Sequence, residues 1–261
     1  MTHPRALTIA GSDSGGGAGI QADLKAFERH AVFGTSAVTL ITAQNTRGVD
    51  ALHMLPVDLV LAQIDAVLSD IGTDAVKTGA LGSADMIDAV RTRLDQLDPR
   101  IPIVVDPVMV SKHGAPLLPD DAVHAVRERL VPRATVLTPN LHEAAALTGR
   151  DIDTEEDMAD AAKALIDLGA HAVVVKGGAL RAGEAVDLLH DGRSIHRFSR
   201  PRALPFAAHG TGCVFSAAIC ARLALGEGLV EAVHTAKDYI LRAIREAPGL
   251  GSGHTPVLHR A

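Results

Sequence analysis

The sequence predicts a three-layer α/β/α domain built around a mainly parallel central sheet. Short apolar segments typical of buried strands alternate with longer segments of helical periodicity throughout the 261 residues. Such alternation produces parallel sheets that are covered by helices on both faces. The sequence shows no internal repeat and no linker rich in Ser or in charge. We therefore expect a single domain over residues 1–261.

The composition favours a small-molecule partner. Apolar residues make up 47% of the chain, but only five Phe, one Tyr and no Trp occur, so Ala, Val, Leu and Ile must form the core. The net charge is −6, and no basic block or interleaving of basic and aromatic residues is present. These features argue against nucleic acid as the main partner.

The sequence also predicts a cytoplasmic protein without a membrane partner. It shows no secretory leader at its start and no apolar run long enough to span a bilayer. Its two cysteines, Cys213 and Cys220, would lie about 10.5 Å apart along one helix, which is too far for a disulfide. A chain without paired cysteines is typical of a reducing compartment.

A glycine-rich segment, residues 11–19, follows the first predicted strand, residues 6–10, and precedes helical periodicity over 20–30. The segment lacks the lysine of a P-loop and fits the dinucleotide pattern GxGxxG only loosely. We expect the backbone of residues 12–19 to close over a small ligand. The alternative is a simple turn.

Gln44 lies just after a second predicted strand, residues 34–42. Ligands of open parallel sheets bind outside the carboxyl ends of the strands. The Gln44 amide offers a donor beside an acceptor, which suits a heterocycle that carries an amino group next to a ring nitrogen. A solvated loop glutamine is the alternative.

The rest of the chain continues the alternation. The expected elements are helix 57–71, strand 75–79, helix 84–97, strand 101–105, helix 120–130, strand 135–137, a helix capped by Asn140 and running to Ala146, helix 154–168, strand 172–175, a hairpin of strands 185–190 and 193–198 turning at 191–192, and helix 230–245. The tail 248–261 is rich in Gly and Pro, and we expect it either to cover the site or to fray.

Charged side chains follow three of these strands. Asp106 comes after strand 101–105, where a carboxylate faces a metal ion or phosphate unless it only caps the turn. Lys176, followed by two glycines, is a point charge suited to phosphate, a surface lysine being the alternative. Glu143 completes a capping box with Asn140, or it is a carboxylate for hydrated Mg²⁺, which needs few protein ligands.

Residues 209–213, His-Gly-Thr-Gly-Cys, precede a strong helix former that extends to residue 225. A helix N-terminus carries unpaired amide groups and partial positive charge, and glycines let an anion approach the backbone. We therefore expect an anion cradle here. The alternative is an ordinary helix start, with Cys213 as a small buried residue.

Six motifs, in this order, resemble the hydroxymethylpyrimidine/phosphomethylpyrimidine kinases of thiamine biosynthesis, which belong to the ribokinase-like superfamily. The motifs are residues 6–25, 42–46, 106–109, 138–144, 175–178 and 209–213. The resemblance implies a ribokinase-like fold, a homodimer, and a kinase that uses ATP and Mg²⁺. It further implies phosphorylation of 4-amino-5-hydroxymethyl-2-methylpyrimidine and then of its monophosphate, giving the pyrophosphate.

The resemblance also implies roles for individual residues. The backbone of Gly210, Thr211 and Gly212 would form the anion hole for the transferring phosphoryl group. Cys213 stands where sugar-kinase relatives carry an Asp base. The residues expected at the substrate are Gln44, Ala18, Gly11, Asp23, Ala80 and Val108. Those expected near the ATP phosphates are Lys176, Lys237 and Asp106, and those expected near Mg²⁺ are Asp106 and Glu143.

A Cys at a helix N-terminus beside cations should have a lowered pKa, so we expect the Cys213 thiolate to accept the hydroxymethyl proton.

The sequence departs from the family at the substrate pocket. Ala80 stands where members usually have Met, which would widen the site. The wider site leaves room for a pyridine, so a pyridoxal or pyridoxine kinase, as sole or additional activity, is the alternative. Gln44 favours the aminopyrimidine. A non-catalytic binder of pyrimidine or nucleotide is a third candidate, against which Asp106, Lys176 and Cys213 argue.

Overall fold

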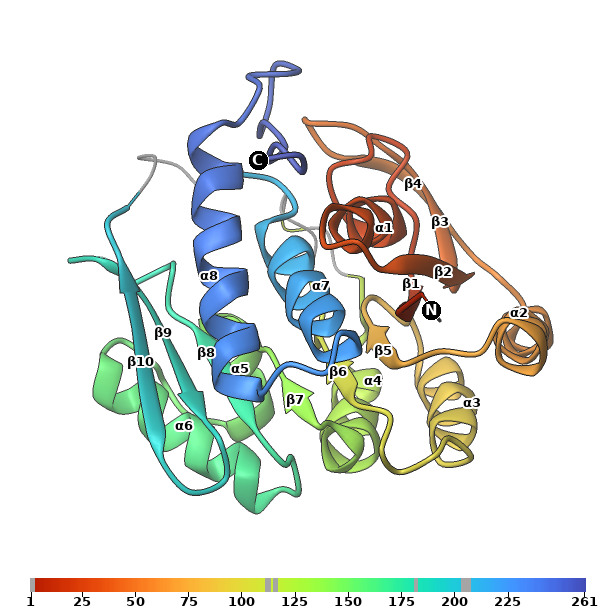
Figure 1. Cartoon of the computed structure of the whole chain (residues 1–261), viewed down its shortest axis with the longest axis horizontal. Helices are drawn as coiled ribbons and strands as arrows, with labels where there is room; N and C mark the ends of the chain where they lie inside the picture. The colour runs from red at the N-terminus through yellow and green to blue at the C-terminus, as the bar shows by residue number, and fades with distance from the viewer. Residues whose placement is uncertain (1–2, 111–113, 115–116, 181–182, 203–207) are drawn as a thin grey trace.

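The computed structural model describes residues 3–110, 114, 117–180, 183–202 and 208–261, and it has the three predicted layers (Figure 1). The strands are β1 (Arg5–Ala10), β2 (Phe33–Val38), β3 (Leu40–Gln44), β4 (Val49–Met54), β5 (Ala75–Thr78), β6 (Ile103–Val105), β7 (Val136–Leu137), β8 (Val173–Lys176), β9 (Ala185–His190) and β10 (Ile195–Arg200). The helices are α1 (Gly19–Arg29), α2 (Val57–Asp70), α3 (Ala84–Leu94), α4 (Asp120–Ala125), α5 (Leu141–Thr148), α6 (Glu155–Asp167), α7 (Thr211–Ala224) and α8 (Leu229–Arg245).

The middle layer is an eight-stranded sheet in the order β10-β9-β8-β7-β6-β5-β1-β2. The six strands from β8 to β2 pair in parallel, whereas β9 runs antiparallel to β8 and β10 antiparallel to β9. The prediction of a mainly parallel sheet is confirmed. Strands such as β6 are buried along their whole length, which is why they consist of continuous apolar residues.

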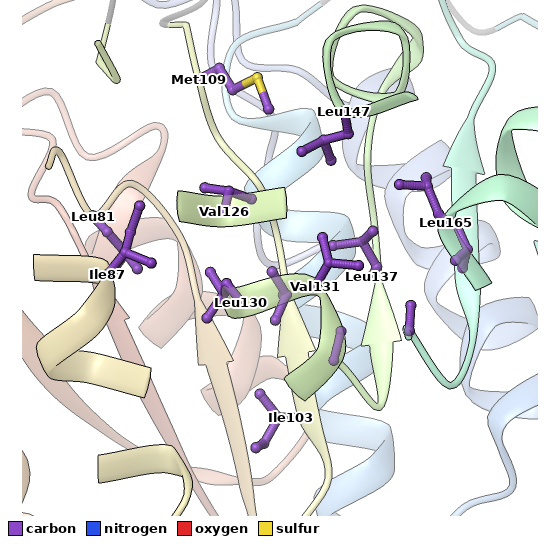
Figure 2. Packing of buried hydrophobic residues seen from close by; sticks show 14 of the residues in the cluster. Leu81, Ile87, Ile103, Met109, Val126, Leu130, Val131, Leu137, Leu147 and Leu165 are labelled. Atoms are coloured by element: carbon purple, nitrogen blue, oxygen red, sulfur yellow. The ribbon is translucent and has the colours of Figure 1, made fainter. Parts of the chain in front are cut away.

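Helices cover both faces of the sheet (Figure 1). On one face α1, α7 and α8 pack together around Phe27 and Tyr239. On the other face α2 to α6 enclose a second core, in which Figure 2 shows Leu130 and Leu147 among the buried side chains. Two such cores hold the sheet rigid, so that loops at its edge start from fixed points.

Capping boxes determine where two helices begin. The Asn140 side chain accepts from the Glu143 amide, and the Glu143 carboxylate accepts from the Asn140 amide. Thr154 and Asp157 form the same arrangement at the start of α6. The predicted cap at Asn140 is therefore confirmed, and Gly149 ends α5 in the left-handed conformation.

The structure differs from the prediction after β2. Residues 34–42 are not one strand, because the chain leaves the main sheet at Thr39, whose amide donates to the Ala10 carbonyl. β3 instead pairs with β4 in a separate antiparallel hairpin beside α1 (Figure 1). No strand was predicted at β4, because most of its residues are exposed and show no alternation of buried and exposed positions. The helix predicted over 120–130 changes after α4 into a π-helix, Val126–Leu130, and a 3₁₀ turn, Val131–Arg133.

The C-terminal tail packs against the loop after β3 and against the residues before α7. The His209 amide donates to the Thr255 carbonyl, and the His254 amide donates to the Thr46 carbonyl. Of the two expectations for residues 248–261, covering is the one observed.

Within the described ranges, no helix combines the length and the apolar character needed to cross a bilayer.

Candidate active site

The candidate site lies at the carboxyl ends of the parallel strands, where ligands of open α/β sheets bind. The glycine-rich loop follows β1, Asp106 follows β6, and Lys176 is the last residue of β8. All three approach the N-terminus of α7 from different positions along the sheet. The structure thus brings together motifs that are up to 200 residues apart in the sequence.

Backbone meets backbone between the glycine-rich loop and α7. Gly210 is the N-cap of α7, with φ of 79°, and a Cβ there would lie 1.7 Å from the Gly17 carbonyl oxygen. Glycine is therefore required at position 210 for its conformation and for the close approach. Among the described residues, no side chain caps the first amides of α7. Uncapped N–H groups at this position are what an anion cradle would need, and the cradle itself stays a prediction.

Asp13, which sequence reasoning missed as a site residue, holds the glycine-rich loop together. Its Oδ1 accepts from the Gly15 amide at 2.8 Å. Its Oδ2 accepts from the amides of Gly17 and Ala18 at 3.1 and 2.8 Å, and His209 Nε2 lies 2.8 Å from the same oxygen. Burial alone would raise the pKa of Asp13, but the hydrogen bonds from His209 and the amides lower it below its ordinary value. The carboxylate is therefore ionised at neutral pH.

Lys176 faces the cradle from the other side. Its Nζ lies 2.8 Å from Asp106 Oδ1 and 4.0 Å from Glu143 Oε2. A Cβ built on Gly212 would be only 3.3 Å from the same Nζ, so the ammonium lies beside the first turn of α7. Ser216 Oγ donates to Asp106 Oδ2 at 3.0 Å. Burial alone would raise the pKa of Asp106, but the nearby lysines lower it.

The charges of this region leave room for a cation. Three buried carboxylates, Asp23, Asp106 and Glu143, face the ammoniums of the buried Lys77 and the partly buried Lys176, so one negative charge is not balanced when all three carboxylates are ionised. Burial, opposed by Lys176, raises the pKa of Glu143 to about 7. Among the described residues no three metal-ligating side chains cluster, but hydrated Mg²⁺ needs only one or two carboxylates. Asp106 and Glu143 fit such an ion.

Cys213 corrects one expectation. Burial raises its pKa to about 12; Lys77 opposes this shift, while Asp106 adds to it. The predicted lowering of the pKa is therefore wrong, because loss of solvation outweighs the lysine and the helix N-terminus. In this structure the side chain is a thiol at neutral pH. Cys220, about two turns further along α7 on the same side, is wholly buried.

Asp23 lies beneath the site. Its Oδ2 is 2.9 Å from Lys77 Nζ and accepts from Thr8 Oγ1 at 2.7 Å, and both members of the ion pair are fully buried. The structure thus gives this carboxylate partners other than a ligand. Its contact with substrate, expected from the resemblance, stays a prediction.

The other expected substrate residues surround the glycine-rich loop. The Gln44 amide lies between Thr42 and His209. Ala18 and Val108 are half-buried, and the half-buried Ala80 accepts at its carbonyl from Thr39 Oγ1. Gly11 is buried, and a Cβ there would lie 2.6 Å from the Leu40 side chain. Their contacts with a ligand stay predictions.

Lys237, expected near the ATP phosphates, forms an ion pair with Asp187 at 2.6 Å. The other oxygen of Asp187 accepts from the Gly177 amide at 3.0 Å. Asp187 therefore joins α8 to the loop that follows Lys176. Sequence reasoning missed it, although its position opposite Lys176 in the β8–β9 pair is a signal that the predicted hairpin contained.

Comparison with known proteins identifies the family. The family model described as phosphomethylpyrimidine kinase matches residues 13–258. The hydroxymethylpyrimidine/phosphomethylpyrimidine kinase of Bacillus subtilis is 46% identical over 262 residues, covering 100% of this chain and 96% of that protein. The kinase of the same name from Rhizobium meliloti is 51% identical, covering 97% and 96%. The thiamine biosynthesis bifunctional protein ThiED of Geobacter sulfurreducens is 53% identical over 97% of this chain, which spans only 51% of that longer protein.

Solved structures of similar proteins are kinases as well. A pyridoxal kinase of Bacillus subtilis, in an ADP complex, matches with a TM-score of 0.91 and 41% identity, covering 99% of this chain and 98% of that one. A phosphomethylpyrimidine kinase from Clostridium difficile matches with a TM-score of 0.82 and 42% identity, covering 92% and 99%. The ribokinase-like fold expected from the resemblance is confirmed. The chain belongs to the phosphomethylpyrimidine kinase family.

Proposed function

We propose that the protein transfers the γ-phosphoryl group of ATP to the hydroxymethyl oxygen of 4-amino-5-hydroxymethyl-2-methylpyrimidine (HMP), and then phosphorylates the monophosphate to the pyrophosphate. The observation that carries this proposal is the convergence of the Lys176 ammonium and the free amides of α7. Full-length similarity to kinases of this name supports the choice of substrate.

The phosphoryl group is stabilised by charge and position. The amides of Thr211, Gly212 and Cys213 belong to the first turn of α7, which has no side-chain cap among the described residues, and Lys176 adds a positive charge beside them. Phosphoryl transfer depends mainly on such positioning and charge stabilisation. Lys237, through Asp187, holds the loop after Lys176 and contributes to the nucleotide side of the site.

Asp106 and Glu143 hold Mg²⁺ in this proposal, mainly through its water ligands. When bound, the ion would neutralise charge on the phosphate oxygens. It would also balance the extra negative charge of the carboxylates. Lys176, which pairs with Asp106 in this structure, would then be free to pair with the phosphates.

Cys213 remains the proposed acceptor of the hydroxymethyl proton. Its thiol must first lose its own proton, and a pKa of about 12 makes the thiolate a minor species at neutral pH. A strong base that is rarely ionised still contributes to the rate, and general-base catalysis is worth about 10²–10⁴-fold.

The substrate lies against the glycine-rich loop. Gln44 pairs with the aminopyrimidine edge, and Ala18, Ala80 and Val108 line the ring. Gly11 allows the backbone to approach. We place Asp23 beneath this pocket, where it supports Lys77.

A side-by-side assay tests the proposal. ADP formation is measured with HMP, with HMP monophosphate and with pyridoxal, with and without Mg²⁺. We expect turnover with both pyrimidines that requires Mg²⁺. Turnover with pyridoxal alone would replace the proposal by its alternative, which the similar pyridoxal kinase structures make worth including. Binding without turnover of any substrate would indicate a non-catalytic binder.

We further propose a homodimer in the cytoplasm. Ile41 and Leu52 on the β3–β4 hairpin are 48% and 41% exposed, which supports a contact between two copies. The two free cysteines suit a reducing compartment. Light scattering of the purified protein tests the dimer, since a monomer at micromolar concentration would contradict it.

A further inference from the structure

Gln44 is held at both its backbone and its side chain. The Ser14 hydroxyl lies 2.8 Å from the backbone nitrogen of Gln44 and 2.8 Å from its backbone carbonyl oxygen. The side-chain amide is flanked by Thr42 Oγ1 at 3.2 Å from Oε1 and by His209 Nε2 at 3.3 Å from Nε2. Because a neighbouring side chain occupies each side of the Gln44 side-chain amide, only its outer edge is left for a ligand.

The proton at His209 Nε2 determines what can face it. This nitrogen lies 2.8 Å from Asp13 Oδ2, and the Asp13 carboxylate is ionised and only accepts. Nε2 therefore carries a proton, whatever the state of the other ring nitrogen. A protonated ring nitrogen has no lone pair with which to accept, so the side-chain NH₂ of Gln44 cannot donate to it, and the amide oxygen is the atom that fits beside it.

Thr42 leads independently to the same orientation. Its hydroxyl donates to the Ser12 carbonyl at 2.8 Å, and a hydroxyl has a single proton. Thr42 Oγ1 can therefore only accept from Gln44, so the atom facing it must be the amide nitrogen. Both arguments place the side-chain oxygen of Gln44 beside His209 and its side-chain nitrogen beside Thr42. A half-turn of the side-chain amide exchanges the two atoms and produces this orientation.

The geometry points to His209 and Thr42 as positioning residues that determine substrate specificity, because together they fix the order in which Gln44 presents its acceptor and donor. In this order an amino group on the substrate donates to Oε1, and the adjacent ring nitrogen accepts from Nε2. This inference rests on the proposed function, since it takes Gln44 as the reader of the pyrimidine edge.

The fixed order discriminates between substrate classes. A ring without the amino group leaves the oriented Oε1 without a donor, and a site built for a hydrogen bond rejects the analogue that lacks it. Pyridoxal has no amino group beside its ring nitrogen. The network therefore selects an aminopyrimidine even though Ala80 leaves space for a pyridine.

The variants that test this keep the loop intact. In His209→Leu, Asp13 retains its hydrogen bonds from the Gly15, Gly17 and Ala18 amides. Thr42→Val is nearly isosteric and removes only the hydroxyl. Each variant is made alone and together with Gln44→Ala, and ATP affinity and thermal unfolding verify that the fold is retained.

The measurement is calorimetric binding, without nucleotide, of HMP and of 5-hydroxymethyl-2-methylpyrimidine, which lacks the amino group. We expect the full chain to prefer HMP by about tenfold or more. His209→Leu and Thr42→Val should each reduce this preference severalfold, and neither should change it when Gln44 is Ala.

Three outcomes would be adverse, and they can be told apart. An undiminished preference in both variants would overturn the inference, and so would an equal loss of preference in the Gln44→Ala background. If the unaltered protein binds neither pyrimidine, the proposed function fails and the inference with it. If His209→Leu does not fold, Thr42→Val decides the question alone.

Discussion

The two halves of the site are held together by different forces. Around the glycine-rich loop, Asp13 gathers backbone amides and His209, and Gln44 lies between hydrogen-bonding neighbours. On the nucleotide side, ion pairs dominate, as in Lys176 with Asp106 and Lys237 with Asp187. The first half is a fixed network of short-range hydrogen bonds, whereas the second is a set of charges.

The difference matches what each half must do. A heterocycle is recognised by donors and acceptors that do not move, so its site is best assembled in advance. Phosphates bring negative charge that must be balanced on arrival, and lysines that are paired with carboxylates can change partners when they arrive. Cys213 lies where the two halves meet, at the first turn of α7.

The largest effect is expected from Cys213→Ala. If the thiolate accepts the proton, kcat falls by about 10²–10⁴-fold while the Kd for ATP is unchanged. Cys220→Ala, a buried residue of the same helix, should leave kcat close to that of the unaltered protein. Because the pKa of Cys213 is about 12, kcat/KM should also rise with pH in the neutral range. An unchanged rate for Cys213→Ala would remove the thiol from the mechanism.

Lys176→Gln tests whether the nucleotide side of the site depends on the charge of this lysine. The variant retains a hydrogen-bond donor for Asp106 but loses the charge beside the cradle. We expect kcat to fall by about 10²–10³-fold, with weaker ATP binding. Lys163→Gln, at an exposed ion pair of α6, is the matched control. Equal kinetics of the two variants would contradict the assignment of Lys176.

Gly210→Ala tests the contact between the halves. The new Cβ would overlap the Gly17 carbonyl and would require a left-handed alanine, so we expect a loss of roughly 3 kcal/mol or more in unfolding free energy. Gly226 has φ of 81° but no atom within 4 Å of its Cβ position. Gly226→Ala should therefore cost only about 1 kcal/mol. Similar losses in denaturant titrations of the two variants would mean that the close approach is unimportant.

The smallest expected effect concerns Glu143. Because its folded pKa of about 7 lies above the ordinary value of 4.5, the folded state holds the proton more tightly, and stability decreases as pH rises through this range. Glu143→Gln removes this loss, so its advantage over the unaltered protein should grow by roughly 2–3 kcal/mol between pH 5 and pH 8 without Mg²⁺. Glu156→Gln, at an exposed position of α6, is the control. Parallel pH profiles for Glu143→Gln and the unaltered protein would contradict the buried, unbalanced charge.

Much of the fold could be predicted because its signals are local. Continuous apolar strands, helical periodicity and the Asn140 capping box are all readable within a few residues. The break at Thr39 is not, because it depends on hydrogen bonds to Ala10 and to Leu55. β4 escaped prediction because its exposed residues carry no periodic pattern.

The site was predictable to the extent that chemistry is carried by motifs. Lys176, Asp106 and the cradle were expected, and the structure brings them together. The role of Asp13 depends on His209, 196 residues away, so no local pattern shows it. The pKa of Cys213 could not be inferred either, because the sequence shows the neighbouring helix N-terminus but not the burial that outweighs it.

The division into two halves is tested most directly by the Kd of Lys176→Gln for HMP, measured by calorimetry without nucleotide. Lys176 belongs to the charged half, so the hydrogen-bonded half should bind HMP with the affinity of the unaltered protein, even though ATP binding is weakened. A weakening of HMP binding by about tenfold or more, in a variant that is still folded, would show that the two halves are not separate.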